Sequence, residues 1–201
     1  MNKKAAVLAV MIVLIWSGVT WAGSAPKTLA GYTLNQGVDK FQELLDMDTV
    51  LPVRHLESLK EVEIKASPGY KSGLVYFSTC IEGKPVVRVK LKCADSSEKF
   101  FENLLAQYRK KFGEPDEWRG DPFKIVMAWK WTFTDDNGDR IGLIIQHNKL
   151  DEEEKKGNSI KLTNNTLMQK EVDCFDAQQP KEKKPPKGKN ERADWEAYIP
   201  R

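Results

Sequence analysis

Residues 125–145 read Ile-Val-Met-Ala-Trp-Lys-Trp-Thr-Phe-Thr-Asp-Asp-Asn-Gly-Asp-Arg-Ile-Gly-Leu-Ile-Ile, and this stretch indicates the fold most directly. In its first half, large apolar residues alternate with smaller or polar ones, which is typical of a strand with one buried face. Asn137 and Gly138 predict a tight turn, because both tolerate the positive φ angles of hairpin turns. The apolar residues from Ile141 onward then return as the partner strand. We therefore expect an antiparallel hairpin, with Trp129 and Trp131 in the core rather than on a ligand-stacking surface.

The acidic turn of this hairpin also admits a calcium-binding interpretation. An EF-hand loop needs glycine at its sixth position and glutamate at its twelfth. Counting Asp135 as the first position, Gly138 stands fourth, and no glutamate follows at the required distance. The turn interpretation is therefore favoured, and we expect no metal site here.

A second clear element follows from residues 97–112. Apolar residues recur there at three- and four-residue spacing, Ser97 can cap the start, and Gly113 and Pro115 mark the end, so the stretch predicts an amphipathic helix. Weaker patterns predict a short helix near residues 38–45 and strands around residues 62–64 and 160–162. Residues 73–92 predict another hairpin, with Leu74 and Tyr76 on the same buried face as Val89 and Leu91.

Together these elements predict an α+β fold. We expect an antiparallel sheet of about five strands, with one long amphipathic helix, residues 97–112, packed on one face and a short N-terminal helix beside it.

The first 22 residues predict a cleavable signal peptide. Lys3 and Lys4 precede an apolar run that extends to about Val19, and cleavage fits best after Ala22. An uncleaved anchor is the alternative, but a membrane-spanning helix needs about 20 apolar residues and this run is shorter. We therefore expect the mature protein in the periplasm or secreted.

Removal of this segment also changes the charge of the chain. The net charge falls from +3 to +1, because residues 1–22 carry two lysines and no acidic residue. A nearly neutral chain gives no case for a nucleic-acid partner, which needs a concentrated basic face. The mature chain contains no transmembrane pattern. It divides into one domain, residues 30–175, and a Pro/Lys-rich tail, residues 177–201, whose composition predicts disorder.

Three cysteines, Cys80, Cys93 and Cys174, would meet an oxidising compartment after export. Cys80 and Cys93 fall about 20 Å apart along the predicted hairpin at about 3.3 Å per residue, whereas bridged Cα atoms lie within about 7 Å. If a disulfide forms, it therefore joins Cys174 to Cys93 or Cys80; three reduced, buried cysteines are the alternative. The chain has only two histidines and no Cys-x-x-Cys spacing, so we expect neither a metal nor a cofactor.

Candidate binding residues lie in a polar loop and at a strand end. Trp118, Arg119 and Asp121 belong to a loop without apolar periodicity, and exposed aromatics with arginine are enriched at binding surfaces. A tryptophan that caps the core is the alternative. His147 ends a strand near the acidic stretch from Asp151 to Glu154, where a carboxylate could orient it as a base.

Several stretches resemble an uncharacterised group of small exported proteins from sulfate-reducing and related bacteria. They are residues 62–65 with 68–73, residues 112–118, and residues 128–131. The resemblance covers about residues 30–165 and implies export, but it brings no activity.

The sequence thus favours a non-catalytic periplasmic binding or envelope-associated module, whose partner is an unknown envelope protein or small ligand. The runner-up is a small periplasmic hydrolase that uses His147 or the acidic stretch from Asp151 to Glu154.

Overall fold

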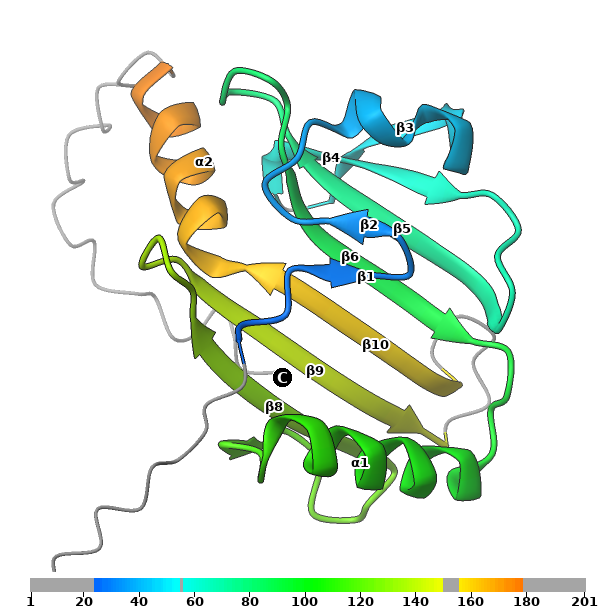
Figure 1. The fold of residues 1–201 in the computed structure, drawn as a ribbon. Helices are drawn as coiled ribbons and strands as arrows, with labels where there is room; N and C mark the ends of the chain where they lie inside the picture. Colours follow the sequence, from blue (N-terminus) through cyan, green and yellow to red (C-terminus); the bar gives the residue numbers. More distant parts are fainter. Residues whose placement is uncertain (1–23, 55, 150–155, 179–201) are drawn as a thin grey trace, which may run out of the picture.

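The computed structural model describes residues 24–54, 56–149 and 156–178 (Figure 1). Three predictions lie outside these residues: the signal peptide, the acidic stretch 151–154, and the disorder of nearly all of the tail. No helix within the described ranges is long and apolar enough to cross a membrane.

Eight strands form one antiparallel sheet in the order β3-β4-β5-β6-β10-β9-β8-β7, and two short strands form a separate ribbon (Figure 1). The ribbon consists of β1 (Thr28–Leu29) and β2 (Tyr32–Thr33). The sheet consists of β3 (Leu45–Val53), β4 (Leu56–Ile64), β5 (Tyr70–Ser78), β6 (Val86–Cys93), β7 (Glu117–Trp118), β8 (Val126–Thr134), β9 (Arg140–Asn148) and β10 (Gly157–Asn164). The helical elements are the 3-10 helix η1 (Val38–Leu44), α1 (Glu98–Phe112) and α2 (Asn165–Gln178).

The predicted α+β fold of about five strands and one long helix is wrong. The described chain is mostly β, with eight strands in its main sheet and only three short helices. The pairing of β3 with β4 shifts register between Asp46 and Leu51, so the apolar residues of β3 do not recur at every second position. The alternating pattern that predicts a strand is therefore absent from β3. β7 is only two residues long.

The position of β10 determines the centre of the sheet. It lies between β6 and β9, and Leu162 stands opposite both Val89 and Leu143. The helix α1 and three strands intervene in the sequence between β6 and β10. β6 and β10 are therefore neighbours in the sheet although they are far apart in the sequence, and local sequence patterns do not predict this pairing.

One face of the sheet forms the larger core beneath α1, η1 and the ribbon β1–β2 (Figure 1). Trp131 is 2 % exposed, and the ring centroids of Tyr108 and Trp131 are 5.9 Å apart. Phe112 meets Phe133 edge-on at 5.5 Å. Such pairs stabilise a core beyond their buried area, so the aromatic row of β8 packs against α1.

Capping residues at both ends of α1 explain why the sequence predicts this helix correctly. The Ser97 hydroxyl accepts a hydrogen bond from the Phe100 N–H at 3.2 Å, which caps the first turn. Gly113 has φ 80° after the last turn, a conformation that favours glycine. Its carbonyl accepts a hydrogen bond from the Trp131 indole at 2.9 Å, which ties the end of the helix to β8.

The opposite face has a smaller core, and the predicted hairpin register is wrong there. Val75, not Leu74 or Tyr76, lies on the same face as Val89 and Leu91. Leu74 and Tyr76 instead contact the second apolar cluster, to which Leu167 and Met168 of α2 belong. β5 is apolar on both sides because each side is covered, so alternation alone does not determine its orientation.

Candidate functional site: a basic sheet face

The predicted loop site of Trp118, Arg119 and Asp121 is divided between two sides of the sheet. The Trp118 ring meets the Trp129 ring at 4.7 Å on the side of α1. It is 38 % exposed, and the ring it covers, that of Trp129, packs against the larger core. Arg119 follows on the opposite side, where its guanidinium contacts Glu117 at 2.8 Å. The Asp121 carboxylate accepts hydrogen bonds from the N–H groups of Phe123, at 2.8 Å, and Val126. Asp121 thus closes its own loop.

His147 lies in the core beneath α1 rather than at a solvated strand end. It is 4 % exposed, and its ring lies 5.7 Å from that of Phe101. Its Nδ1 is 2.7 Å from Oδ1 of Asn158, whose amide group donates to the carbonyls of Asp95 and Ser97. Because the Asn158 amide donates elsewhere, its oxygen accepts from His147 Nδ1–H. This chain of hydrogen bonds positions the start of α1.

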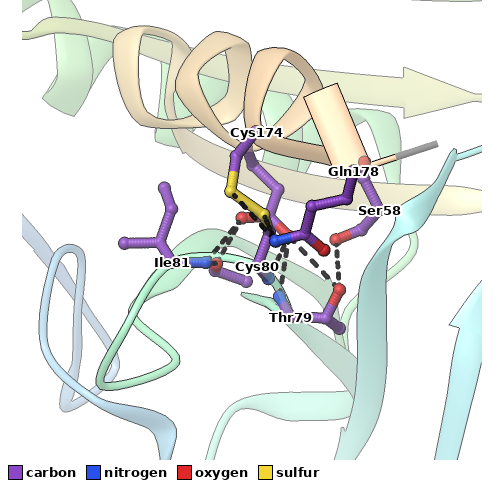
Figure 2. Close-up of a disulfide and its surroundings, with 8 residues drawn as sticks. Ser58, Thr79, Cys80, Ile81, Cys174 and Gln178 are labelled. Carbon is purple, nitrogen blue, oxygen red and sulfur yellow. Dashed lines mark hydrogen bonds between the residues drawn. A yellow bond between two sulfur atoms is a disulfide. The ribbon is translucent and has the colours of Figure 1, made fainter. Parts of the chain in front are cut away.

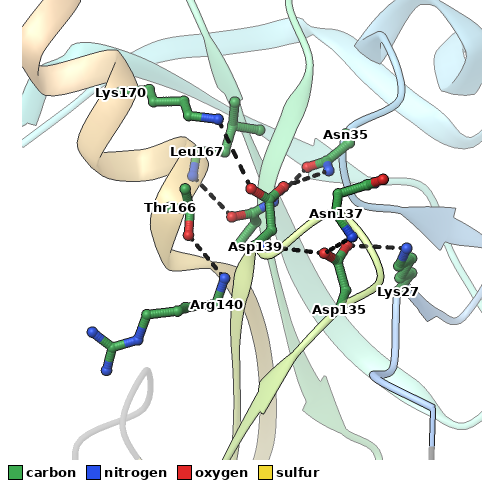
Figure 3. Close-up of polar contacts among 10 residues, drawn as sticks. Lys27, Asn35, Asp135, Asn137, Asp139, Arg140, Thr166, Leu167 and Lys170 are labelled. Atoms are coloured by element: carbon green, nitrogen blue, oxygen red, sulfur yellow. Dashed lines mark hydrogen bonds and ion pairs between the residues drawn. The ribbon is translucent and has the colours of Figure 1, made fainter.

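In the acidic turn between β8 and β9, the carboxylates bind groups of the protein itself (Figure 3). The Asp135 Oδ1 atom accepts hydrogen bonds from the N–H groups of Asn137 and Asp139, both at 2.9 Å. The Asp135 Oδ2 atom lies 3.0 Å from the Lys27 ammonium, and that hydrogen bond holds the pKa of Asp135 below its usual value. Only Gly138 in this turn has a positive φ. Within the described ranges no cluster of ligating side chains could hold a metal ion.

The helix α2 is attached to the second face by a disulfide and a buried carboxylate (Figure 2). The disulfide joins Cys80 and Cys174, whose Cα atoms are 6.1 Å apart, whereas Cys93 is a buried free thiol. Glu171 is fully buried one helical turn before Cys174. Its carboxylate accepts the backbone N–H groups of Thr79 at 2.7 Å, Cys80 at 2.9 Å and Ile81 at 3.2 Å. These donors compensate the buried charge.

Basic side chains gather on the sheet face opposite α1, beside α2, whose Met168 contacts the Arg88 guanidinium. We call this set the basic face: Arg88, Lys90 and Lys92 on β6, Lys161 on β10, Lys130 on β8, and Arg119 just after β7. Cross-strand register brings them together. Residues paired across a sheet share a face, and Lys90, Lys161 and Lys130 are joined through Ile144 in one row.

Lys161 lies at the centre of the basic face. It stands directly opposite Lys90, and like charges in that position destabilise a sheet. In the described part of the chain, no carboxylate forms an ion pair with Lys161, Lys90 or Arg88. Burial, followed by the positive charges of Arg88 and Lys90, lowers the pKa of Lys161 to about 8.

Arg88 contributes a second half-buried charge. Its Nε donates to the Thr163 hydroxyl at 3.1 Å, and its guanidinium lies 5.4 Å from the centre of the Tyr76 ring. These partners are neutral, and burial lowers the pKa of Arg88. The positive charge of Arg88 therefore adds to that of the neighbouring lysines.

Acidic side chains occupy the margins of the basic face. Glu117 bonds Arg119 at 2.8 Å and the Lys130 ammonium at 3.2 Å, at the β8 side. Glu63 lies at the β5 side, where it lines a hollow of about 280 Å³ together with Lys90 and Lys92. A second hollow of about 150 Å³ also adjoins Lys90 and Lys92. Both hollows adjoin Lys90, which stands opposite Lys161, so this positive part of the face suits an anion.

Sequence reasoning missed this surface except for Arg119. The alternation of Arg88, Lys90 and Lys92 indicated only a solvated face of one strand. Lys130 and Lys161 each stand between apolar residues on strands far apart in the sequence. In addition, a chain whose net charge is close to zero can still concentrate positive charge on one part of its surface. Net charge alone therefore does not exclude a nucleic-acid partner for this chain.

No family model, no curated protein and no solved structure matches this chain. The resemblance of residues 30–165 to a group of exported proteins stays a prediction. The protein is therefore described by its fold and its site alone. It has an antiparallel eight-stranded sheet with α1 on one face and a basic surface on the other.

Proposed function

We propose that this protein is an exported, non-catalytic binding module that holds anionic ligands on the basic face of its sheet. The observation that carries the proposal is Lys161, a half-buried lysine among basic neighbours that has no carboxylate partner among the described residues. A bound anion supplies the missing negative charge and so offsets the repulsion between Lys161 and Lys90.

The proposal of export rests on the signal pattern of residues 1–22 and on the Cys80–Cys174 disulfide. Structural disulfides persist in oxidising compartments such as the periplasm. Expression in a bacterial host followed by cell fractionation tests this part. We expect protein that begins at Gly23 in the periplasmic or secreted fraction. Protein that retains residues 1–22 in the membrane fraction would support the uncleaved anchor instead.

The hydrolase hypothesis receives no support from His147. The imidazole is buried, and its Nδ1 is engaged with Asn158. A general base must reach the proton that it abstracts, and His147 faces α1 rather than the basic face. The acidic stretch 151–154, the other basis of that hypothesis, lies outside the described residues.

Calorimetric titration with citrate, a small multivalent anion, tests the binding proposal. We expect wild-type protein to bind citrate at low salt, and Lys161→Met to weaken binding about tenfold or more through loss of the central charge. Lys110→Met is the matched control, because Lys110 is an exposed lysine on α1. Absence of citrate binding, or equal weakening by both substitutions, would contradict the proposal. Circular dichroism establishes that both variants are folded.

A further inference from the structure

The basic face extends too far for one small anion. Three lysines, Lys90, Lys161 and Lys130, lie in a row from β6 to β8. Three strand spacings of about 4.8 Å separate these strands, so the row spans about 14 Å. Along β6, Arg88 and Lys92 are about 13 Å apart at about 3.3 Å per residue. Lys130 is paired with Glu117 at the β8 end of the row. A ligand that spans the row from Lys90 to Lys130 must therefore carry several anionic groups, one of which competes with Glu117.

We propose that the ligand is a linear acidic polysaccharide, a chain of sugars that bear carboxylates. This inference rests on the proposed function and specifies the ligand class of the same face. A polymer lying across the strands gains from multivalency, since each further charge binds at a high effective concentration. The two hollows both adjoin Lys90 and Lys92, so a chain can run from one hollow to the other past these lysines.

Polar side chains between the basic ones fit the hydroxyl groups of sugars. Ser159 stands opposite both Lys92 and Gln146. Gln146 and Ser159 line the smaller hollow, and Ser72 lines the larger one. Hydroxyl and amide groups can both donate and accept hydrogen bonds. The face thus offers cations for carboxylates and neutral partners for sugar hydroxyls.

The arrangement of aromatic rings disfavours single-stranded nucleic acid. Proteins that bind it combine a basic groove with aromatic rings on which bases stack. Tyr76 is the aromatic residue in these rows, and it is only 7 % exposed with Arg88 over its ring. Trp118 and Trp129 lie on the other side of the sheet. The described part of the basic face therefore offers carboxylate-binding groups without a stacking platform.

The test compares affinities of the purified, disulfide-bonded protein for four probes. They are polygalacturonate, monomeric galacturonate, inorganic phosphate and an oligothymidylate, each measured by calorimetry at two salt concentrations. We expect polygalacturonate to bind at least about tenfold more tightly per site than the monomer or phosphate, and its affinity to fall with salt. We expect oligothymidylate to bind more weakly than polygalacturonate.

Two matched substitutions locate the binding. Lys90→Glu changes an exposed residue of the basic face, and Lys110→Glu makes the same charge change on α1. We expect Lys90→Glu to reduce affinity for polygalacturonate about tenfold and Lys110→Glu to leave it within about twofold. Equal losses in the two variants would overturn both proposals, because attraction would then depend on net charge alone.

The other outcomes separate this inference from the proposed function. Equal binding of monomer and polymer, or tighter binding of oligothymidylate, would overturn the polysaccharide inference and leave anion binding standing. Failure of all four probes to bind would overturn both.

Discussion

Lys161 on β10 lies directly opposite Lys90 on β6, and neither forms an ion pair within the described ranges. Like charges in this position lower the stability of a sheet, and burial increases the cost for Lys161. An arrangement that lowers stability is common at functional sites, where the ligand supplies the compensating interaction. We therefore base the account of function on this pair.

Replacement of Lys161 should stabilise the free protein at neutral pH. The pKa of Lys161 is lowered to about 8 in the folded state, against about 10.5 for an ordinary lysine. Discounted for partial solvent screening, Lys161→Met should raise the free energy of unfolding by about 1–2 kcal/mol at pH 7. Urea denaturation measures this change, and Lys110→Met serves as the exposed control.

The sign of the pH dependence follows from linkage. Between about pH 8 and 10.5 the unfolded state binds more protons at Lys161 than the folded state, so wild-type stability gains from rising pH in this window. The advantage of Lys161→Met should therefore be complete below pH 8 and vanish by about pH 10.5. The difference between the two proteins isolates the titration of Lys161 from that of every other group. An advantage that stays constant across this range would contradict the assignment.

Loss of the Glu171 carboxylate should strongly destabilise the protein. Its carboxylate accepts three backbone N–H groups next to Cys80, and an amide in its place would bring its own donor toward them. We expect Glu171→Gln to cost roughly 2–4 kcal/mol of unfolding free energy. Asp176→Asn, at an exposed position of α2, should change stability by less than about 0.5 kcal/mol. Similar losses in the two variants would refute this role for Glu171.

Removal of the disulfide should weaken the attachment of α2. The bond closes a loop with a sequence separation of 94 residues, and loss of such a bridge typically costs about 2–5 kcal/mol. Cys80→Ser with Cys174→Ser should lower the urea midpoint accordingly. Peptide mapping without reduction should recover Cys80 linked to Cys174. A fragment with Cys93 linked to Cys174 would contradict the structure.

The remaining thiol, Cys93, should be inert in the folded protein. It is 4 % exposed, and burial raises its pKa to about 11. The thiolate is the reactive form. A thiol reagent at pH 8 should therefore label native protein at least about a hundredfold more slowly than protein unfolded in guanidinium. Comparable rates would show that Cys93 is accessible.

Local sequence patterns predicted single elements well where capping and periodicity agree. The helix ending at Gly113 and the hairpin turn at Gly138 are examples, since each has a chemical signal in the sequence. The whole fold was predicted wrongly because β3 is irregular and β10 joins β6 from a distance in the sequence. No local signal specifies the neighbour of a strand.

The candidate site was missed for the same physical reason. Nothing in the local sequence around Lys161, between Ile160 and Leu162, indicates a functional residue. Its role in the proposed site depends on Lys90, which stands opposite it on β6. Of the predicted site residues, Arg119 lies on the basic face, whereas Asp121 and His147 serve local structure. Residue type and spacing indicate sites within one element, whereas this face combines residues from several strands.

The most direct test of the central claim is a two-dimensional amide NMR titration of the protein with polygalacturonate. We expect the largest shift changes on β6, β10 and the neighbouring part of β8, centred on Lys90 and Lys161. We also expect Lys161→Met to reduce them. Shift changes confined to α1 or to residues 121–125, or an unchanged spectrum at saturating polymer, would contradict the claim that the basic face is the binding surface.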